Sequence, residues 1–188
     1  MLYNNGYVIK DLIDNEDLSL SSDVYRGIEN YHSWPLETQK DSVSLDLTKQ
    51  LEKHFDENDY VEILKDVNLL KKYVKHCKEL GIDVVIFKIM TANNSLVTNV
   101  DLKEIEVLGY DCIVGGSVSY LTEVFCDELE KFELFNKTKK KVNSNGLLNS
   151  YDEAEVFIKE REKLIEQGLN LEAYWKAVPA RLSIVTLD

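Results

Sequence analysis

The stretch "NLLKKYVKHCKELGIDVVIFKIM", from Asn68 to Met90, decides the fold class because its hydrophobic period changes at a single glycine. Before the glycine, apolar residues recur at i, i+3, i+4 and i+7, the spacing of one buried helical stripe. These residues are Leu70, Tyr73, Val74 and Cys77. Gly81 stands where a helix commonly ends in a residue with positive φ. The apolar, β-branched run after it is typical of a strand covered on both faces. We therefore expect a helix over 68–80 and a buried strand over 83–90.

The rest of the chain predicts more helices and strands around this unit. Ser150 and Glu153 have the spacing of a capping box, which indicates a helix start. Residues 1–43 are rich in loop signals and show only the beginnings of a strand, near Tyr7. The other expected elements are helices over 44–55, 119–132 and 150–168, and strands over 104–114, 171–177 and 181–187, the last two hinged at Pro179. Together they predict an α+β fold, a small mixed sheet packed against several amphipathic helices, in one globular domain spanning 1–188.

The chain is strongly acidic, with a net charge of −12 from 22 basic and 34 acidic residues. Residues 1–66 hold fifteen of the acids and six of the bases, a net of −9. Such a surface repels nucleic-acid phosphates and anionic lipids, and it attracts a basic partner. The alternative is that the charge serves only solubility. We expect a protein partner with a basic surface, and neither a nucleic acid nor a membrane.

Cysteine usage and the N-terminal sequence bear on localisation. Cys77, Cys112 and Cys126 are odd in number and lack CxxC spacing, which is typical of reduced thiols. The N-terminus shows no basic region followed by an apolar run, and no apolar stretch approaches the ~20 residues that span a bilayer. These features predict a cytoplasmic protein.

The turn "VGGSVSYL" is the candidate ligand site, since a strand there runs into glycines, serines and a helix. Gly115, Gly116 and Ser117 lack the spacing of a dinucleotide fingerprint or a Walker loop. One interpretation is a strand-to-helix turn in which Ser117 or Ser119 is the N-cap. The other is an anion site at the free N–H groups of the helix start, within Gly115–Tyr120.

Catalytic and metal-binding patterns are not apparent. Ser119 is not part of a GxSxG elbow, and His32, His54 and His76 lie in three different segments. We therefore predict no catalytic residue, no metal site and no cofactor.

The densest acidic cluster is "DENDYVE", which contains Asp56, Glu57, Asp59 and Glu62. It lacks the ligand order and central glycine of an EF-hand. A solvated acidic turn is one interpretation. The other is a contact surface for a basic partner, and these four residues are the predicted partner-binding set.

Three stretches together resemble bacterial immunity proteins of polymorphic toxin systems. They are a "GYD" strand that runs into a small-residue turn and "SYL", the loop and acidic helix "NSNGLLNSYDEAEVF", and the terminal strand "ARLSIVTL". The likeness covers Leu108 to Asp188, and no functional residue is carried over from it. It implies a non-enzymatic inhibitor that binds a toxin domain and occludes its active site. The competing hypothesis is a small enzyme or an anion- or nucleotide-binding domain with its site at Gly115–Tyr120.

Overall fold

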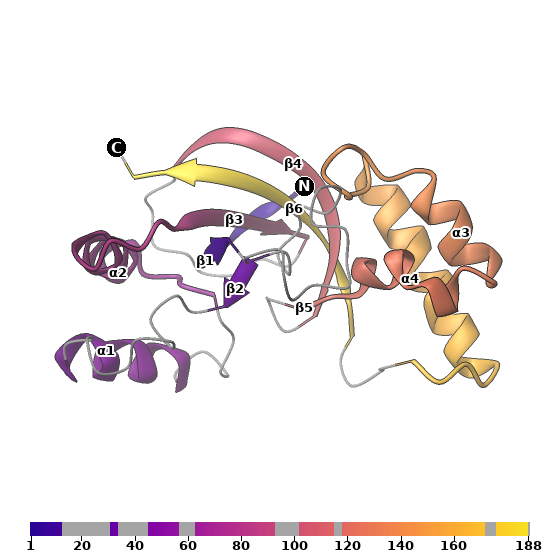
Figure 1. The fold of residues 1–188 in the computed structure, drawn as a ribbon, viewed down its shortest axis with the longest axis horizontal. Helices are drawn as coiled ribbons and strands as arrows, with labels where there is room; N and C mark the ends of the chain where they lie inside the picture. Colours follow the sequence, from indigo (N-terminus) through magenta and orange to yellow (C-terminus); the bar gives the residue numbers. More distant parts are fainter. Residues whose placement is uncertain are drawn as a thin grey trace.

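The computed structural model describes residues 1–12, 31–33, 45–56, 63–92, 102–114, 118–171 and 176–187. Within these ranges six strands form one curled sheet in the order β2-β1-β3-β6-β4-β5 (Figure 1). They are β1 (Tyr3–Leu12), β2 (Tyr31–Ser33), β3 (Val85–Thr91), β4 (Lys103–Val114), β5 (Val118–Ser119) and β6 (Val178–Thr186). The α+β class is confirmed.

The pairing of the strands corrects one detail, because every described pair is antiparallel and the sheet is not mixed. β3 and β4 follow one another in the chain, yet β6 lies between them and pairs with both. The last strand of the chain therefore separates two consecutive ones. No local pattern in the sequence signals such an insertion.

The helices gather at opposite ends of the sheet (Figure 1). The first end carries α1 (Leu45–Asp56) and α2 (Val67–Glu79), and the second carries α3 (Glu133–Lys139), α4 (Tyr151–Glu166) and the 3₁₀ turns η4 (Tyr120–Phe125) and η5 (Asp127–Leu129). No helix in the described part of the chain combines the length and the hydropathy that crossing a membrane requires.

The α2–Gly81–β3 unit has the predicted form. Asp66 caps α2 by accepting hydrogen bonds from two backbone N–H groups of its first turn. At the other end the Ile82 N–H donates to the Cys77 carbonyl at 2.9 Å, and the Gly81 N–H donates to Lys78. This is a Schellman motif, and Gly81 adopts the φ of +73° that it requires. All four residues of the predicted helical stripe are buried.

The sheet separates two hydrophobic cores, as the alternation along β3 shows. Phe87 and Ile89 belong to the core that packs under α4, whereas Ile86 belongs to the core beneath α1 and α2. β1 alternates in the same way, with Val8 in the first core and Tyr7 in the second. β3 is therefore covered on both faces, as its continuous apolar sequence predicts.

The predicted helix over 119–132 is wrong in type. The chain forms the two 3₁₀ turns η4 and η5 there, separated by Cys126, whose φ and ψ of −81° and 117° are extended. The Thr122 hydroxyl donates to the Ser119 carbonyl at 2.8 Å, a local bond that competes with regular helix. The apolar positions still face inward, since Leu121 and Val124 are fully buried. A true helix, α3, begins only after Phe132, outside the predicted helical range.

The expected hinge at Pro179 is also wrong. β6 runs without interruption through Pro179, which pairs with Cys112 of β4. Among the described strands, pairing with β3 begins only at Ala180, so Pro179 pairs with β4 alone. A proline near the start of a strand is tolerated for this reason.

Candidate docking surface

A surface groove of about 560 Å³ lies between α3 and α4. The start of α4 is fixed by Ser150, whose hydroxyl accepts from the Glu153 N–H at 3.2 Å, while the Glu153 carboxylate accepts from the Asn149 N–H. The predicted helix start is therefore confirmed. Phe157 and Phe135 meet edge to face, with ring centroids 6.0 Å apart, and hold the two helices together beneath the groove.

The groove combines an apolar floor with a charged rim. Its apolar lining is Phe132, Leu134, Leu148, Val156, Phe157 and Leu164. Its charged lining is Glu133, Lys137, Lys141, Asp152, Glu153, Glu160 and Lys163. Val156 of α4 is 57% exposed and lines the groove. Apolar surface enclosed by charged groups is the arrangement found at protein interfaces.

The outward surface of α4 is acidic, and we call it the α4 acidic face. It holds six carboxylates and two ammonium groups, a surplus of four negative charges. They belong to Asp152, Glu153, Glu155, Lys159, Glu160, Glu162, Lys163 and Glu166. Both lysines are in ion pairs within the helix, Lys159 with Glu155 and Lys163 with Glu160. A surplus of carboxylates therefore remains on this face of the helix.

A buried ion pair anchors α4 to the rest of this end of the molecule. The Arg161 guanidinium donates to both carboxylate oxygens of Glu123 in η4, and its Nε lies 2.7 Å from Oε2. The guanidinium also stacks on the Tyr120 ring, 3.6 Å from the centroid. Arg161 is buried, so this bidentate pair fixes the orientation of the α4 acidic face.

Only Asp56 of the four predicted partner-binding residues lies within the described part of the chain. Asp56 is the last residue of α1, at the other end of the sheet, and its side chain is not described. Glu57, Asp59 and Glu62 lie outside the described residues. The hypothesis based on the charge of residues 1–66 does not include the α4 acidic face. A helical wheel of 151–166 would have shown it, since the acids recur on one side.

The predicted ligand turn is described only in part, because Gly115, Gly116 and Ser117 lie outside the described residues. Ser119 is buried and is the N-cap of η4, since its hydroxyl accepts from the Leu121 N–H at 3.1 Å. The same hydroxyl donates to the buried Asp111 carboxylate, which also accepts from the Cys112 N–H at 2.7 Å. Ser119 thus has a structural role within the predicted turn.

Replacing Ser119 with alanine should lower the free energy of unfolding by about 1–3 kcal/mol, because η4 loses its cap and buried Asp111 loses a donor. Urea unfolding of the two proteins measures the difference. Ser150→Ala is the matched control, since Ser150 is a helix cap with partial exposure and should cost only about 1 kcal/mol. A smaller effect at position 119 than at position 150 would contradict the structural role of the Ser119–Asp111 contact.

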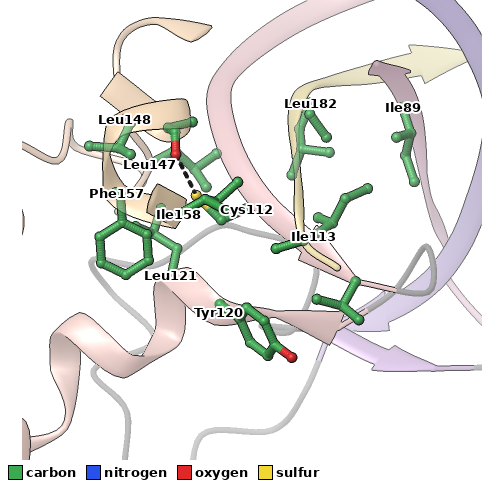
Figure 2. Close-up of a cluster of buried hydrophobic side chains, with 14 of the residues drawn as sticks. Ile89, Cys112, Ile113, Tyr120, Leu121, Leu147, Leu148, Phe157, Ile158 and Leu182 are labelled. Carbon is green, nitrogen blue, oxygen red and sulfur yellow. Dashed lines mark hydrogen bonds between the residues drawn. The ribbon is translucent and has the colours of Figure 1, made fainter. Parts of the chain in front are cut away.

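Cys77, Cys112 and His54 have structural roles in the described part of the chain. Cys77 and Cys112 are buried, and the Cys112 thiol donates to the Ala154 carbonyl of α4 at 3.7 Å, the dashed contact in Figure 2. Burial, together with the charge of Asp111, raises the pKa of the Cys112 thiol well above its usual range, so it is unreactive. The His54 ring accepts from the Lys65 N–H at 3.2 Å and ties α1 to the segment before α2.

A second polar cluster, the β4–β6 cluster, lies across three adjacent strands and consists of Lys88 (β3), Glu104 (β4), Arg181 and Ser183 (β6). Burial raises the pKa of Glu104. The hydrogen bond from Lys88 and the charges of Arg181 and Lys88 lower this pKa by more than burial raises it, so it lies below its ordinary value. Glu104 is thus ionised at neutral pH. Only the strand register brings these residues together, so no spacing in the sequence indicates them.

Comparisons with protein-family models, with curated proteins and with solved structures find no match to this chain.

Proposed function

We propose that the chain is a non-enzymatic binding protein that docks a basic protein on the α4 acidic face, in the manner of an immunity-type inhibitor. The main supporting observation is the surplus of four negative charges on the α4 acidic face, which borders the groove between α3 and α4 that the exposed Val156 lines. A partner with basic groups around an apolar contact complements this surface in both charge and polarity.

The charge of the whole chain supports the same kind of partner. A net charge of −12 creates a field that raises the rate of encounter with a basic surface and repels acidic competitors. Nuclease-type toxins expose basic grooves to hold phosphate backbones, so an acidic protein that covers such a groove excludes the substrate. Inhibition of this kind requires occlusion and no chemistry from the inhibitor.

The anchoring of α4 supports a preorganised docking surface. Arg161 and Phe157 attach the buried side of the helix to η4 and α3. The helix backbone that carries the α4 acidic face is then held in one position before the partner arrives. Preorganisation lowers the ordering cost of association and favours tight binding.

The experiment that tests the proposal is capture from the native cell followed by co-expression. The tagged chain is used to capture proteins, and each captured protein is then expressed alone and together with the chain. We expect one captured protein to have a basic surface, to inhibit growth when expressed alone and to lose this effect when co-expressed with the chain. Growth inhibition that co-expression leaves unchanged for every captured protein would contradict the inhibitor proposal.

Neutralising the α4 acidic face should slow association with that protein. In the variant Asp152→Asn/Glu155→Gln/Glu162→Gln/Glu166→Gln, we expect the on-rate at low salt to fall about tenfold or more, and its dependence on salt to weaken. Surface plasmon resonance over a salt series measures both quantities. Circular dichroism checks that the fold persists, since all four side chains are at least partly exposed.

A matched control separates local from global charge. The variant Asp46→Asn/Glu52→Gln/Glu79→Gln/Asp83→Asn removes the same number of exposed carboxylates at the α1–α2 end. It should keep most of the parent on-rate. Equal slowing by both variants would mean that only net charge acts. The predicted set Asp56, Glu57, Asp59 and Glu62 stays a prediction, and its neutralised variant is a third arm of the same experiment.

A further inference from the structure

Residues 143–148, which we call the α4 entry loop, attach the start of α4 to β4. The Tyr110 N–H donates to the Leu148 carbonyl at 2.8 Å, and the Leu148 N–H donates to the Tyr110 carbonyl at 3.0 Å. Within the loop, the Asn143 N–H donates to the Leu147 carbonyl at 2.7 Å. The loop is therefore closed on itself and bonded to the sheet just before α4 begins.

Two asparagine side chains hold the α4 entry loop in place. Asn143 Oδ1 accepts from the N–H groups of Asn145 and Leu147, at 2.8 and 3.1 Å. The carboxamide nitrogens of Asn143 and Asn145 both donate to the Leu108 carbonyl of β4, at 2.8 and 3.1 Å. Bonds of this kind from asparagine to nearby backbone are a common way to fix a turn.

Asn145 is followed by Gly146, and an asparagine–glycine step is chemically labile. In the reaction, the Gly146 backbone nitrogen attacks Asn145 Cγ, and the new N–Cγ bond replaces the C–N bond of the carboxamide. The departing nitrogen takes up the glycine amide proton and leaves as ammonia. Water then opens the succinimide ring at one of its two carbonyls, which gives aspartate or isoaspartate. A glycine favours the attack because no side chain obstructs it.

In the native fold both reacting groups are held by other partners. The Gly146 N–H donates to the Asn143 carbonyl at 2.9 Å, and Gly146 is buried, so a base has little access to its proton. The Asn145 carboxamide is held on the Leu108 carbonyl. Gly146 has a φ of +73°, a conformation that favours glycine, which accounts for a labile step at this place.

We propose that Asn145–Gly146 is a deamidation site that the α4 entry loop keeps closed and that reacts when this loop opens. An aspartate at 145 places a carboxylate against the Leu108 carbonyl, where the native chain has a donor. An isoaspartate lengthens the backbone by one methylene, so the hydrogen bonds inside the loop no longer match. The reaction therefore converts a transient opening into a permanent loss of the attachment between β4 and α4.

The test follows deamidation of the full chain during incubation at mildly alkaline pH. Digestion with pepsin in acid and mass spectrometry then separate the asparagine, aspartate and isoaspartate forms of each peptide. We expect Asn145 of the folded chain to react at least about tenfold more slowly than Asn145 of the same chain unfolded in urea, because opening the loop costs free energy.

Two variants of neighbouring asparagines make the assignment specific. Asn143→Ala removes three hydrogen bonds of the α4 entry loop and should speed the reaction of Asn145 about fivefold or more. Asn149→Ala is the matched control. It removes one exposed hydrogen bond, to the Lys141 carbonyl, and leaves the loop contacts intact, so Asn145 should react within about twofold of the parent rate.

The second asparagine–glycine step of the chain, Asn5–Gly6, is an internal reference in every sample. It lies in β1, so opening of the α4 entry loop leaves it in place, whereas global unfolding exposes both steps. In Asn143→Ala we therefore expect a faster reaction at Asn145 and an unchanged rate at Asn5. If Asn143→Ala does not fold, Asn143→Asp keeps the acceptor and loses only the bond to Leu108, and it should speed Asn145 about threefold or more.

Three results would overturn the proposal. The first is a rate at Asn145 in the folded parent that equals the rate in urea. The second is a rate in Asn143→Ala that does not exceed the rate in Asn149→Ala. The third is equal acceleration of Asn145 and Asn5 in the folded variant, which would assign the reaction to global unfolding.

Discussion

Replacing Glu123 with alanine should lower the free energy of unfolding by about 3–5 kcal/mol, because it leaves the buried Arg161 guanidinium without its carboxylate. The parent pair is bidentate, and only 3% of the Arg161 side chain is exposed. Stacking on Tyr120 cannot replace the lost charge, since a cation–π contact is worth about 0.5–2 kcal/mol. Urea unfolding followed by circular dichroism measures the change.

Two further variants check the origin of this effect. Glu162→Ala removes an exposed carboxylate of α4 and should change stability by less than about 0.5 kcal/mol. The double variant Glu123→Leu/Arg161→Met removes both charges and should be more stable than Glu123→Ala, because the buried guanidinium is removed together with its carboxylate. A loss below about 1 kcal/mol in Glu123→Ala would contradict the anchoring of α4 by this pair.

Replacing Phe87 with alanine should cost about 3–5 kcal/mol through lost hydrophobic transfer energy and the cavity that remains. Phe87 is 0% exposed and lies in the middle of β3, opposite Val8 on one side and Ile184 on the other. It belongs to the core that extends through Ile89 and Leu182 to the residues under α4 (Figure 2). Such a loss is a large part of a typical stability of ~5–15 kcal/mol.

Ile105→Ala on β4 is the control for this prediction, because Ile105 is 60% exposed. Its truncation should change the unfolding free energy by less than about 1 kcal/mol. Similar costs at positions 87 and 105 would contradict the assignment of β3 as a strand covered on both faces.

The sequence predicts the elements whose determinants are local. The α2–Gly81–β3 unit follows from a helical stripe, a glycine with positive φ and an apolar run, and each is a short-range signal. The 3₁₀ turns at 120–129 could not be predicted in this way, because apolar spacing alone does not separate them from an α-helix. The insertion of β6 between β3 and β4 depends on contacts between distant residues.

The polar surfaces also differ in how far they can be predicted from the sequence. The α4 acidic face is formed by one continuous segment, so the helical periodicity of 151–166 is enough to identify it. The β4–β6 cluster cannot be identified in this way, since Lys88 and Arg181 are far apart in the chain and meet only through strand register. The role of Ser119 follows from the sequence only in part. The sequence predicts Ser119 as one of two candidate N-caps, and its N-cap position is confirmed. Its hydrogen bond to Asp111 is seen only in the structure.

The central claim, that a basic partner docks on the α4 acidic face, is tested most directly by carboxylate footprinting of the captured complex. Exposed Asp and Glu side chains are labelled in the free chain and in the complex, and the modified positions are found by mass spectrometry. We expect strong protection of Asp152, Glu155, Glu162 and Glu166, with Asp46 and Glu52 of α1 labelled equally in both states. Unchanged labelling of α4 in a complex that protects carboxylates elsewhere would contradict the claim.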